Sequence, residues 1–181
     1  MVGPGKGRRV IWGNFDDVGM ASMHVAISFV AINAPQLRSW MVREDLESHR
    51  CLYSTYSDIT VMLGELDLVK EGPSASACAA VSLAVVWGQK KLASPLLAIT
   101  GTLDLRDRIG IIGGMMGKMS VARNVPREMI VVPSDNLKEL EEKGYPDWPD
   151  DLVVYAKERL HGVSNYIELL ELTLQGEHDG R

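Results

Sequence analysis

Lys-Glu-Gly-Pro-Ser-Ala-Ser occupies residues 70–76 and leads directly into Ala-Cys-Ala-Ala-Val-Ser-Leu-Ala-Val-Val-Trp, residues 77–87. The second stretch is rich in alanine, valine and leucine and contains neither glycine nor proline, so it predicts a buried helix. Gly88 follows it, where glycine is favoured just beyond a helix C-terminus. Ser74 therefore lies between a Gly-Pro turn and the start of a predicted helix.

Strands and helices alternate on both sides of this stretch, but at uneven spacing. Residues 8–12 are typical of a short strand, Asp16 and Asp17 lie where the N-cap of a helix is expected, and that helix should end before Pro35. This pattern favours a mixed α+β fold, and we expect one domain over residues 1–181, with a core at about 5–174 and a frayed tail at 175–181. Further strands are predicted at residues 58–63, 96–100, 103–112, 129–132 and 152–155, and further helices at 36–49, 115–123, 136–143 and 165–174.

The composition is that of a folded, mildly acidic protein. The chain has 181 residues, 46% of them hydrophobic, and a formal net charge of −5, without a basic stripe that would favour nucleic acid. The longest weakly polar stretch, residues 75–87, is too short to span a bilayer, and the first residues lack the apolar segment of a secretory signal. We interpret the two cysteines, Cys51 and Cys78, as reduced thiols and expect an intracellular protein.

The turn at residues 72–74 gives the Ser74 hydroxyl two chemical advantages. It projects the hydroxyl away from the main chain, and the free N–H groups of the first helical turn can stabilise a developing oxyanion. The alternative is that Ser74 only caps the helix, because serine is favoured at that position. Taken alone, the pattern favours the cap. Ser76 is a competing candidate for the nucleophile.

A nucleophilic serine also needs a base. None of the four histidines has a local pattern that resembles a Ser-His-Asp arrangement. A lysine can replace histidine where its surroundings favour the uncharged amine. Lys118 is the candidate, since it follows the apolar, glycine-rich segment Gly-Gly-Met-Met-Gly at residues 113–117.

The same glycines superficially suggest a phosphate-binding loop. The spacing fails, because Met119 stands where that loop needs serine or threonine directly after its lysine. Cysteines and histidines do not have zinc-ligand spacing, and the acidic residues do not form a calcium-loop pattern. We therefore expect no cofactor and no metal in this domain.

Three segments together resemble the C-terminal proteolytic domain of the Lon family of ATP-dependent serine proteases. Residues 71–75, Glu-Gly-Pro-Ser-Ala, are similar to the family's Asp-Gly-Pro-Ser-Ala-Gly nucleophile motif. Residues 99–106 are similar to its Met-Thr-Gly-Glu segment ending in Leu-Arg-Gly, and residues 112–118 to its Ile-Gly-Gly-Leu-Lys-Glu-Lys segment. With the opening strand and helix and residues 131–136, the resemblance covers about residues 5–174.

The resemblance implies a Lon protease-domain fold and a Ser-Lys dyad, with Ser74 as the nucleophile and Lys118 as the general base. It also implies that Thr100 hydrogen-bonds the Lys118 amine, and that Glu71 and Glu65 place acidic side chains near the site. Family members act on unfolded or damaged polypeptides as hexameric rings. Their ATP and Mg belong to an AAA+ ATPase module, which these residues do not contain.

Several residues depart from the family's pattern. Thr102 stands where glutamate is common, Asp107 where glycine is common, and Ser76 where glycine is usual. Met-Met-Gly at residues 115–117 replaces Leu-Lys-Glu directly before the lysine. These departures motivate one alternative, a catalytically weak or inactive Lon-like assembly domain. A viral polyprotein-processing protease, which can also use a Ser-Lys dyad, is a second alternative.

Overall fold

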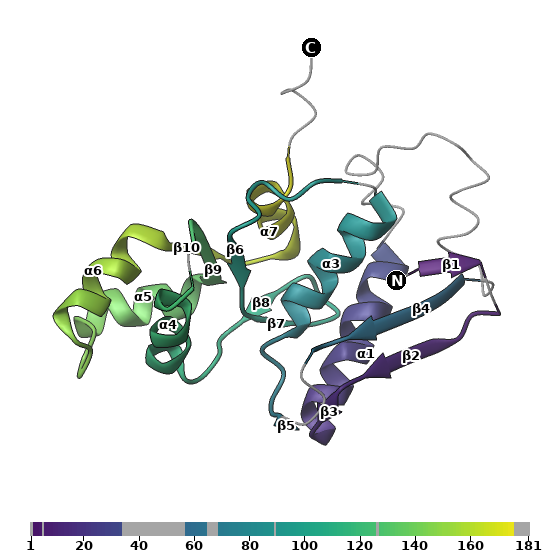
Figure 1. Ribbon diagram of the computed structural model, residues 1–181, viewed down its shortest axis with the longest axis horizontal. Coiled ribbons are helices and arrows are strands. Elements are labelled where there is room, and N and C mark those ends of the chain that lie inside the picture. Colours follow the sequence, from purple (N-terminus) through teal and green to yellow (C-terminus); the bar gives the residue numbers. More distant parts are fainter. Residues whose placement is uncertain are drawn as a thin grey trace, which may run out of the picture.

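A computed structural model of the chain describes residues 2–4, 6–33, 57–64, 69–88, 90–125 and 127–175. Figure 1 shows two groups of helices at opposite ends of the long axis, with short strands between and beside them. The mixture of helices and short sheets confirms the predicted α+β class. The helices are α1 (Asp17–Asn33), α3 (Ser76–Gly88), α4 (Met115–Arg123), α5 (Ser134–Lys143), α6 (Asp150–Arg159) and α7 (Tyr166–Thr173).

Within the described ranges, the strands form two sheets of three strands and two pairs. In one sheet, of order β1-β4-β2, strand β4 pairs antiparallel with β1 and parallel with β2. In the other, of order β10-β9-β6, both pairings are parallel. Strand β3 pairs parallel with β5, and β7 pairs antiparallel with β8. The strands are β1 (Val2–Pro4), β2 (Arg9–Trp12), β3 (Asn14–Phe15), β4 (Ser57–Met62), β5 (Val69–Lys70), β6 (Leu97–Ile99), β7 (Thr102–Leu103), β8 (Ile109–Gly110), β9 (Met129–Pro133) and β10 (Leu160–Val163).

The parallel sheet β10-β9-β6 is a wall between two hydrophobic cores. Successive side chains of a strand point to opposite faces. On β9, Val131 accordingly belongs to one core, whereas Ile130 and Val132 belong to the other. Because both faces of the sheet are covered, its strands are apolar on both sides, as is usual for parallel sheets.

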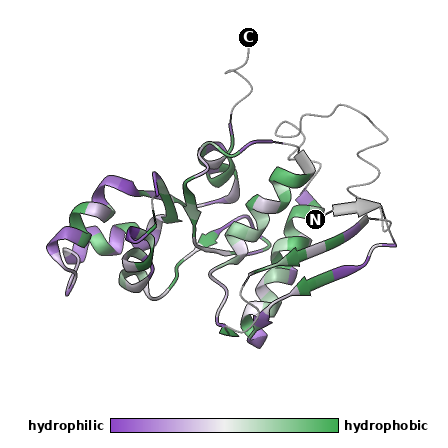
Figure 2. Ribbon diagram, in the orientation of Figure 1, coloured by the Kyte–Doolittle hydropathy of each residue, from purple (hydrophilic) through white to green (hydrophobic). Residues whose placement is uncertain are grey.

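The large core lies mainly between α1, α3, α7 and the sheet β1-β4-β2. Helices α1 and α3 are hydrophobic over most of their length (Figure 2), in keeping with their mutual packing. Tyr166 of α7 is fully buried there, and its ring meets the Phe29 ring edge-on, with the two ring centroids 5.2 Å apart. Its hydroxyl donates a hydrogen bond to the Ala80 carbonyl at 2.8 Å. Among the described residues, its buried members include Met23, Val30, Ile59, Ala77, Val81, Leu103, Val163, Leu169 and Leu170.

The small core lies on the other face of the shared sheet, under α4, α5 and α6. Figure 2 shows many hydrophilic residues along α5 and α6. Each helix buries only a few of its residues, among them Leu140 of α5 and Leu152 of α6. Leu152 and Ala156 of α6 are four residues apart, which places them on one face of the helix, and both are buried. The other buried members of the cluster are Ile112, Met115, Met119, Ile130, Val132, Leu140, Tyr145 and Leu160.

Two predicted strands are wrong. Residues 103–112 form not one strand but a hairpin of β7 and β8, because Asp104 folds the intervening turn. Its carboxylate accepts hydrogen bonds from the main-chain N–H groups of Arg106 and Arg108 at 2.8 and 3.0 Å. Asp107 completes the turn with a φ of 70°, which is uncommon for a residue other than glycine.

The predicted strand at residues 152–155 is the middle of helix α6. Its β-branched run suggested a strand, but Asp150 and Asp151 begin a helix here, and burial of one face decides the conformation. The true strand, β10, follows directly and was missed. The predicted helix at residues 36–49 and, except for Gln175, the predicted tail at 175–181 lie outside the described residues. The Gln175 N–H donates to the Lys91 carbonyl at 2.9 Å. Within the described ranges, no helix is long and apolar enough to cross a membrane.

Candidate functional site

Ser74 lies in the turn between β5 and α3, at one end of the large core. Gly72 makes this turn possible, because its φ of 73° lies in the left-handed region. The Ser74 carbonyl oxygen accepts from the main-chain N–H of Gly101 at 2.9 Å and from the Thr100 hydroxyl at 3.4 Å. The nucleophile candidate is thus fixed through its own main chain to the segment that follows β6.

Ser76 has a different environment from Ser74. It is completely buried, and its hydroxyl donates to the Pro73 carbonyl at 2.8 Å while accepting from the Leu103 N–H at 2.9 Å. Both bonds brace the turn around Ser74. The Ser76 hydroxyl is therefore a structural group and is poorly placed to attack a substrate.

Two N–H groups in the first turn of α3 already have partners, so they are not available to an oxyanion in the way that the sequence suggests. The Ser76 N–H donates to the Pro73 carbonyl at 3.1 Å, and the Ala77 N–H donates to the Gly101 carbonyl at 3.2 Å. The hydrogen bond found for the Ser74 hydroxyl oxygen comes from another helix.

That second helix is α4, which carries Lys118. Gly114 precedes α4 with a φ of 69°, a left-handed conformation that suits glycine. Asn136, itself buried, holds the segment just before it. The Asn136 side chain accepts from the Ile112 N–H and donates to the Ile112 carbonyl, each at 2.9 Å. Met119 is buried in the small core, so the helix is anchored on the side next to Lys118.

The Lys118 amine and the Ser74 hydroxyl meet across the space between these elements. Lys118 Nζ donates to Ser74 Oγ at 3.2 Å, and both side chains are half-buried. The two groups open into a cavity of about 550 Å³, here called the Ser74 cavity. Its walls are mostly apolar: Leu63, Ala75, Cys78, Ala98, Ile99, Thr100, Gly117, Met119, Val121, Ala122 and Ile130 complete the lining.

Cys78 is the one further group in the Ser74 cavity that invites a chemical reading, because a thiolate would be a strong nucleophile. Burial raises the pKa of the Cys78 thiol, which disfavours the thiolate. Cys78 therefore serves as a small apolar wall residue beside Ser74.

The remaining predicted site residues differ in where they lie. Thr100 lines the Ser74 cavity as expected, but its hydroxyl donates to the Ser74 carbonyl instead of contacting the Lys118 amine. Glu71 is exposed on the turn before Ser74 and is not part of the cavity wall. Glu65 lies outside the described residues.

Two residues near the site were not predicted for it. Asn136, described above, holds the segment before α4. Asp16 was expected only to cap a helix, and its carboxylate does accept from the Gly19 N–H at 2.6 Å. The same carboxylate also accepts from the N–H of Gly72, two residues before Ser74. No local sequence signal indicates this second contact, because its partners are 56 positions apart.

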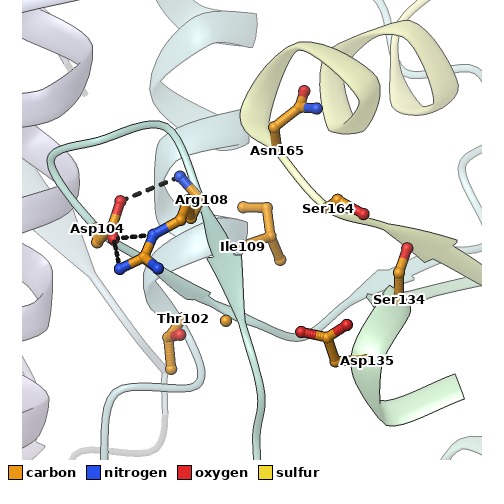
Figure 3. A pocket seen from close by; sticks show the side chains of 9 residues that line it. Thr102, Asp104, Arg108, Ile109, Ser134, Asp135, Ser164 and Asn165 are labelled. Atoms are coloured by element: carbon orange, nitrogen blue, oxygen red, sulfur yellow. Dashed lines mark hydrogen bonds and ion pairs between the residues drawn. The ribbon is translucent and has the colours of Figure 1, made fainter. Parts of the chain in front are cut away.

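A larger, polar pocket lies elsewhere, between the β7–β8 hairpin and the starts of α5 and α7 (Figure 3). It has a volume of about 650 Å³, and its charged groups include Asp104, Arg108 and Asp135. Asp104 and Arg108 pair with each other at 2.8 Å. This pocket does not contain a serine or threonine paired with a base, so it is a weaker candidate for chemistry than the Ser74 cavity.

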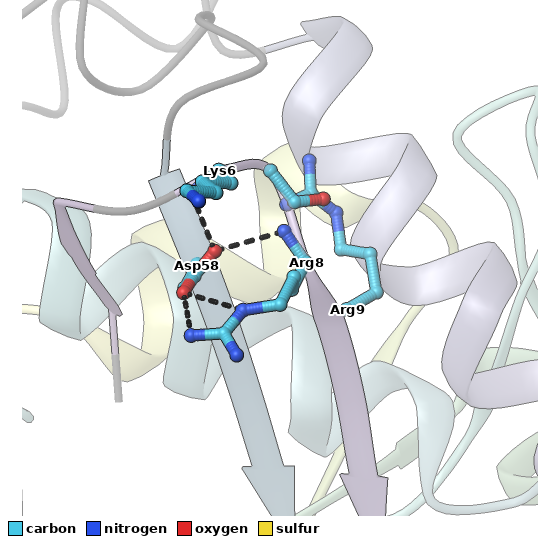
Figure 4. A network of polar contacts seen from close by, with 5 residues as sticks. Lys6, Arg8, Arg9 and Asp58 are labelled. Carbon is cyan, nitrogen blue, oxygen red and sulfur yellow. Dashed lines mark hydrogen bonds and ion pairs between the residues drawn. The ribbon is translucent and has the colours of Figure 1, made fainter.

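A further polar network joins the loop before β2 to strand β4 (Figure 4). The Asp58 carboxylate accepts from the main-chain N–H groups of Lys6 and Arg8, each at 2.9 Å, and pairs with the Arg8 guanidinium at 2.6 Å. These hydrogen bonds, that from the Arg8 side chain first, lower the pKa of Asp58 to about 2. No group of three or more His, Cys, Asp or Glu side chains gathers as a possible metal site in the part of the chain that the structure describes.

Comparison with known proteins gives a consistent result. Residues 1–175 match the family model described as the Lon protease C-terminal proteolytic domain. A Lon protease of Endomicrobium trichonymphae is 30% identical over 94% of this chain and 19% of its own length. Lon protease 1 of Syntrophobacter fumaroxidans is 32% identical over 78% of this chain and 16% of its own length, and the Lon protease of Escherichia coli (strain K12) is 29% identical over 98% and 20%. The chain thus spans about a fifth of the length of these curated relatives.

Proposed function

Because the chain belongs to the Lon protease C-terminal proteolytic domain family, we propose that it is a serine peptidase domain in which Ser74 attacks the peptide bond and Lys118 is the general base. The single observation that carries this proposal is the 3.2 Å contact between Lys118 Nζ and Ser74 Oγ. A base must lie within hydrogen-bond reach of the proton that it removes, and this distance meets the condition.

The first half of the reaction forms an acyl-enzyme. The uncharged Lys118 amine takes the proton of the Ser74 hydroxyl as Oγ bonds to the carbonyl carbon of the substrate. The resulting oxyanion needs N–H donors. Those of Ser74 and Ala75 are the candidates, since none of the hydrogen bonds found among the described residues uses them. The tetrahedral intermediate then breaks its C–N bond, and Lys118 gives its proton to the departing amine.

The second half of the reaction releases the product acid. A water molecule attacks the acyl carbon while Lys118 removes one of its protons, and the bond to Ser74 Oγ then breaks. Lys118 returns the proton to Oγ, so both side chains recover their starting forms. No metal or cofactor takes part in this sequence of steps.

The shape of the site supports a polypeptide substrate. A second hollow of about 360 Å³ lies between β4 and α3 and shares Leu63, Ala75 and Cys78 with the wall of the Ser74 cavity. Two adjoining, largely apolar hollows suit successive side chains of an extended chain, as in an unfolded protein. We place the domain in a homo-oligomeric, ATP-dependent assembly, with ATP and Mg bound outside the residues described here.

Replacement of either dyad residue tests the proposal. In the full-length protein, Ser74→Ala and Lys118→Ala should each slow casein cleavage by roughly 10²–10⁴-fold or more. Lys118→Arg keeps the positive charge but cannot supply an uncharged base, so it should be as inactive as Lys118→Ala. Lys138→Ala, at an exposed position on α5 outside both hollows, is a control that should cleave normally.

A fluorophosphonate probe provides a readout that does not depend on unfolding or ATP. The probe should label wild-type protein at Ser74, label Lys118→Ala far more slowly, and not label Ser74→Ala. Undiminished cleavage by Ser74→Ala or Lys118→Ala would reject the dyad. Absence of labelling and cleavage in a folded wild-type assembly would favour the inactive assembly domain instead.

A further inference from the structure

Beyond the dyad itself, we propose that Asp16 is a positioning residue that fixes the turn bearing Ser74. The inference rests on the proposed function, because it concerns how the nucleophile is presented. Asp16 lies directly before α1, between strand β3 and the helix. It does not touch the dyad, so any effect on catalysis must pass through the main chain of the turn.

The Asp16 carboxylate joins two separate segments. One oxygen, Oδ1, accepts from the Gly19 N–H of α1 at 2.6 Å and from the Gly72 N–H at 3.2 Å, and the other, Oδ2, lies 3.1 Å from the same Gly72 nitrogen. A carboxylate at a helix N-terminus is held there by the free N–H groups and by the helix dipole. The Asp16 carboxylate, which accepts from the Gly72 N–H, is therefore held in place by α1.

A second contact makes the attachment two-sided. The Asp16 N–H donates to the Lys70 carbonyl at 3.1 Å, so Asp16 binds the chain both at Lys70 and at Gly72. Phe15 and Lys70 are register partners in the pair β3–β5, which brings the two segments together just before the turn. The turn thus has its start anchored on both sides of Glu71, and Ser74 follows two residues later.

Gly19 supplies independent support for a close junction. A Cβ atom at this position would lie 2.9 Å from Asp16 Oδ1 and 3.1 Å from the Lys70 carbonyl oxygen. The first turn of α1 can therefore approach Asp16 and the β5 segment this closely only because residue 19 has no side chain. The close junction thus depends on Gly19, and the carboxylate that bridges it is that of Asp16, three residues earlier.

Asp16 should affect catalysis by fixing the position of the Ser74 hydroxyl. A displacement of about 1 Å at a reacting atom can cost roughly 100-fold in rate. Loss of the Gly72 contact should let the turn shift, which weakens the approach of Ser74 Oγ to Lys118 and to the substrate carbonyl. Binding of the rest of the polypeptide should change little, so the effect should appear in kcat and not in KM.

Three variants of the full-length protein test this. Asp16→Ser keeps a cap for α1, but its shorter side chain cannot span to Gly72, so kcat should fall roughly 10–100-fold with KM within about twofold. Asp16→Asn retains a carbonyl oxygen that can accept both N–H groups more weakly, and should lose only about 2–5-fold. Asp17→Asn removes the same charge from the neighbouring exposed residue and should cleave at the wild-type rate.

Amide hydrogen exchange at Gly72 gives a readout that is independent of activity. Exchange should be faster in Asp16→Ser than in wild-type or Asp17→Asn protein. A wild-type kcat in Asp16→Ser, with Ser74→Ala inactive, would overturn the role of Asp16 and leave the proposed function intact. An equal loss in Asp16→Ser and Asp17→Asn would also overturn it, since charge alone would then be responsible.

If Asp16→Ser does not fold, Asp16→Asn decides, and a rate equal to that of the wild type contradicts the proposal. Retained cleavage in Ser74→Ala would instead refute the proposed function, and the positioning role with it. The two failures are therefore distinguished by the same set of proteins.

Discussion

The two halves of the candidate site reach the same point from different cores. Ser74 belongs to a turn at the end of the large core and is held by main-chain hydrogen bonds to Gly101 and by the braces of Ser76. Lys118 belongs to a helix packed on the small core, and the elements that support it are α6 and the Asn136 contact. The serine is fixed by hydrogen bonds, whereas the lysine is fixed mainly by apolar packing.

This difference explains why the shared sheet is important for the site. The distance between Ser74 Oγ and Lys118 Nζ stays constant only if the two cores keep a fixed position relative to each other. Strand β9 contributes buried side chains to both cores, and the segment after its neighbour β6 binds the Ser74 turn. We expect the two cores to unfold as one cooperative unit for this reason.

The largest change in stability is expected from substitutions that leave a cavity in one core at a time. Leu170 and Leu152 are fully buried leucines, one in the large core and one in the small core. Leu170→Ala and Leu152→Ala should each lower the free energy of unfolding by about 2–5 kcal/mol. Leu105→Ala, at a side chain 58% exposed, is the control and should change it by no more than about 0.5 kcal/mol.

Two measurements check this expectation: denaturant unfolding monitored by circular dichroism, and thermal unfolding monitored by calorimetry. Both variants should show a single transition that is shifted as a whole. Two separate transitions in either variant would show that the cores unfold independently, and the shared sheet would then not be the element that keeps serine and lysine in register.

A smaller effect should distinguish the two modes of support. Asn136→Ala leaves the buried N–H and carbonyl of Ile112 without partners, which should cost about 2–3 kcal/mol of stability. The loss should also displace the start of α4 and reduce the rate of fluorophosphonate labelling of Ser74. Asn124→Ala, at an exposed position after α4, serves as the matched control. A destabilised Asn136→Ala protein that still labels at the wild-type rate would show that packing alone places Lys118.

Sequence was informative where the chemistry depends on local conformation. Ser74 and Lys118 are predicted from the segments before them, a Gly-Pro turn and an apolar, glycine-rich run, together with the family resemblance, and α3 is predicted because its apolar run has no breaker. The Leu-Val-Val-Tyr run in α6 suggested a strand, because β-branched residues favour strands until burial of one helical face outweighs that preference. The pair β3–β5 is only two residues long on each side, too short to show any periodicity.

Long-range contacts were the part that the sequence did not reveal. Asp16 was recognised as a cap, since its partner Gly19 is three residues away. Its second partner, Gly72, is separated from it by all of α1 and by strands β4 and β5, so no spacing rule connects the two. Thr100 was placed at the site, but its hydrogen bond goes to the main chain of Ser74 and not to the lysine. Side-chain direction of this kind is settled by tertiary packing.

The smallest expected effect is a loss of stability at acid pH, and it arises from Asp58 at the edge of the large core. Asp58 has a pKa of about 2 in the folded protein, below its ordinary value of 3.8, because Arg8 and nearby N–H groups favour the carboxylate. A folded-state pKa that is lowered stabilises the protein above the unfolded-state pKa, and this contribution disappears as the pH falls through the folded value. The stabilisation from Asp58 should therefore be complete at neutral pH and be lost between about pH 4 and pH 2.

Asp58→Asn should accordingly have a lower Tm than wild-type protein at about pH 6, with the difference shrinking as the pH approaches about 2. The network is exposed, so the difference should be small and should also shrink in high salt. Asp17→Asn, which removes a carboxylate outside this network, should not show such a pH-dependent difference. A Tm difference between Asp58→Asn and wild-type protein that is constant over the whole pH range would mean that the Asp58 contacts act by shape alone. The lowered pKa would then contribute nothing to the stability of this sheet.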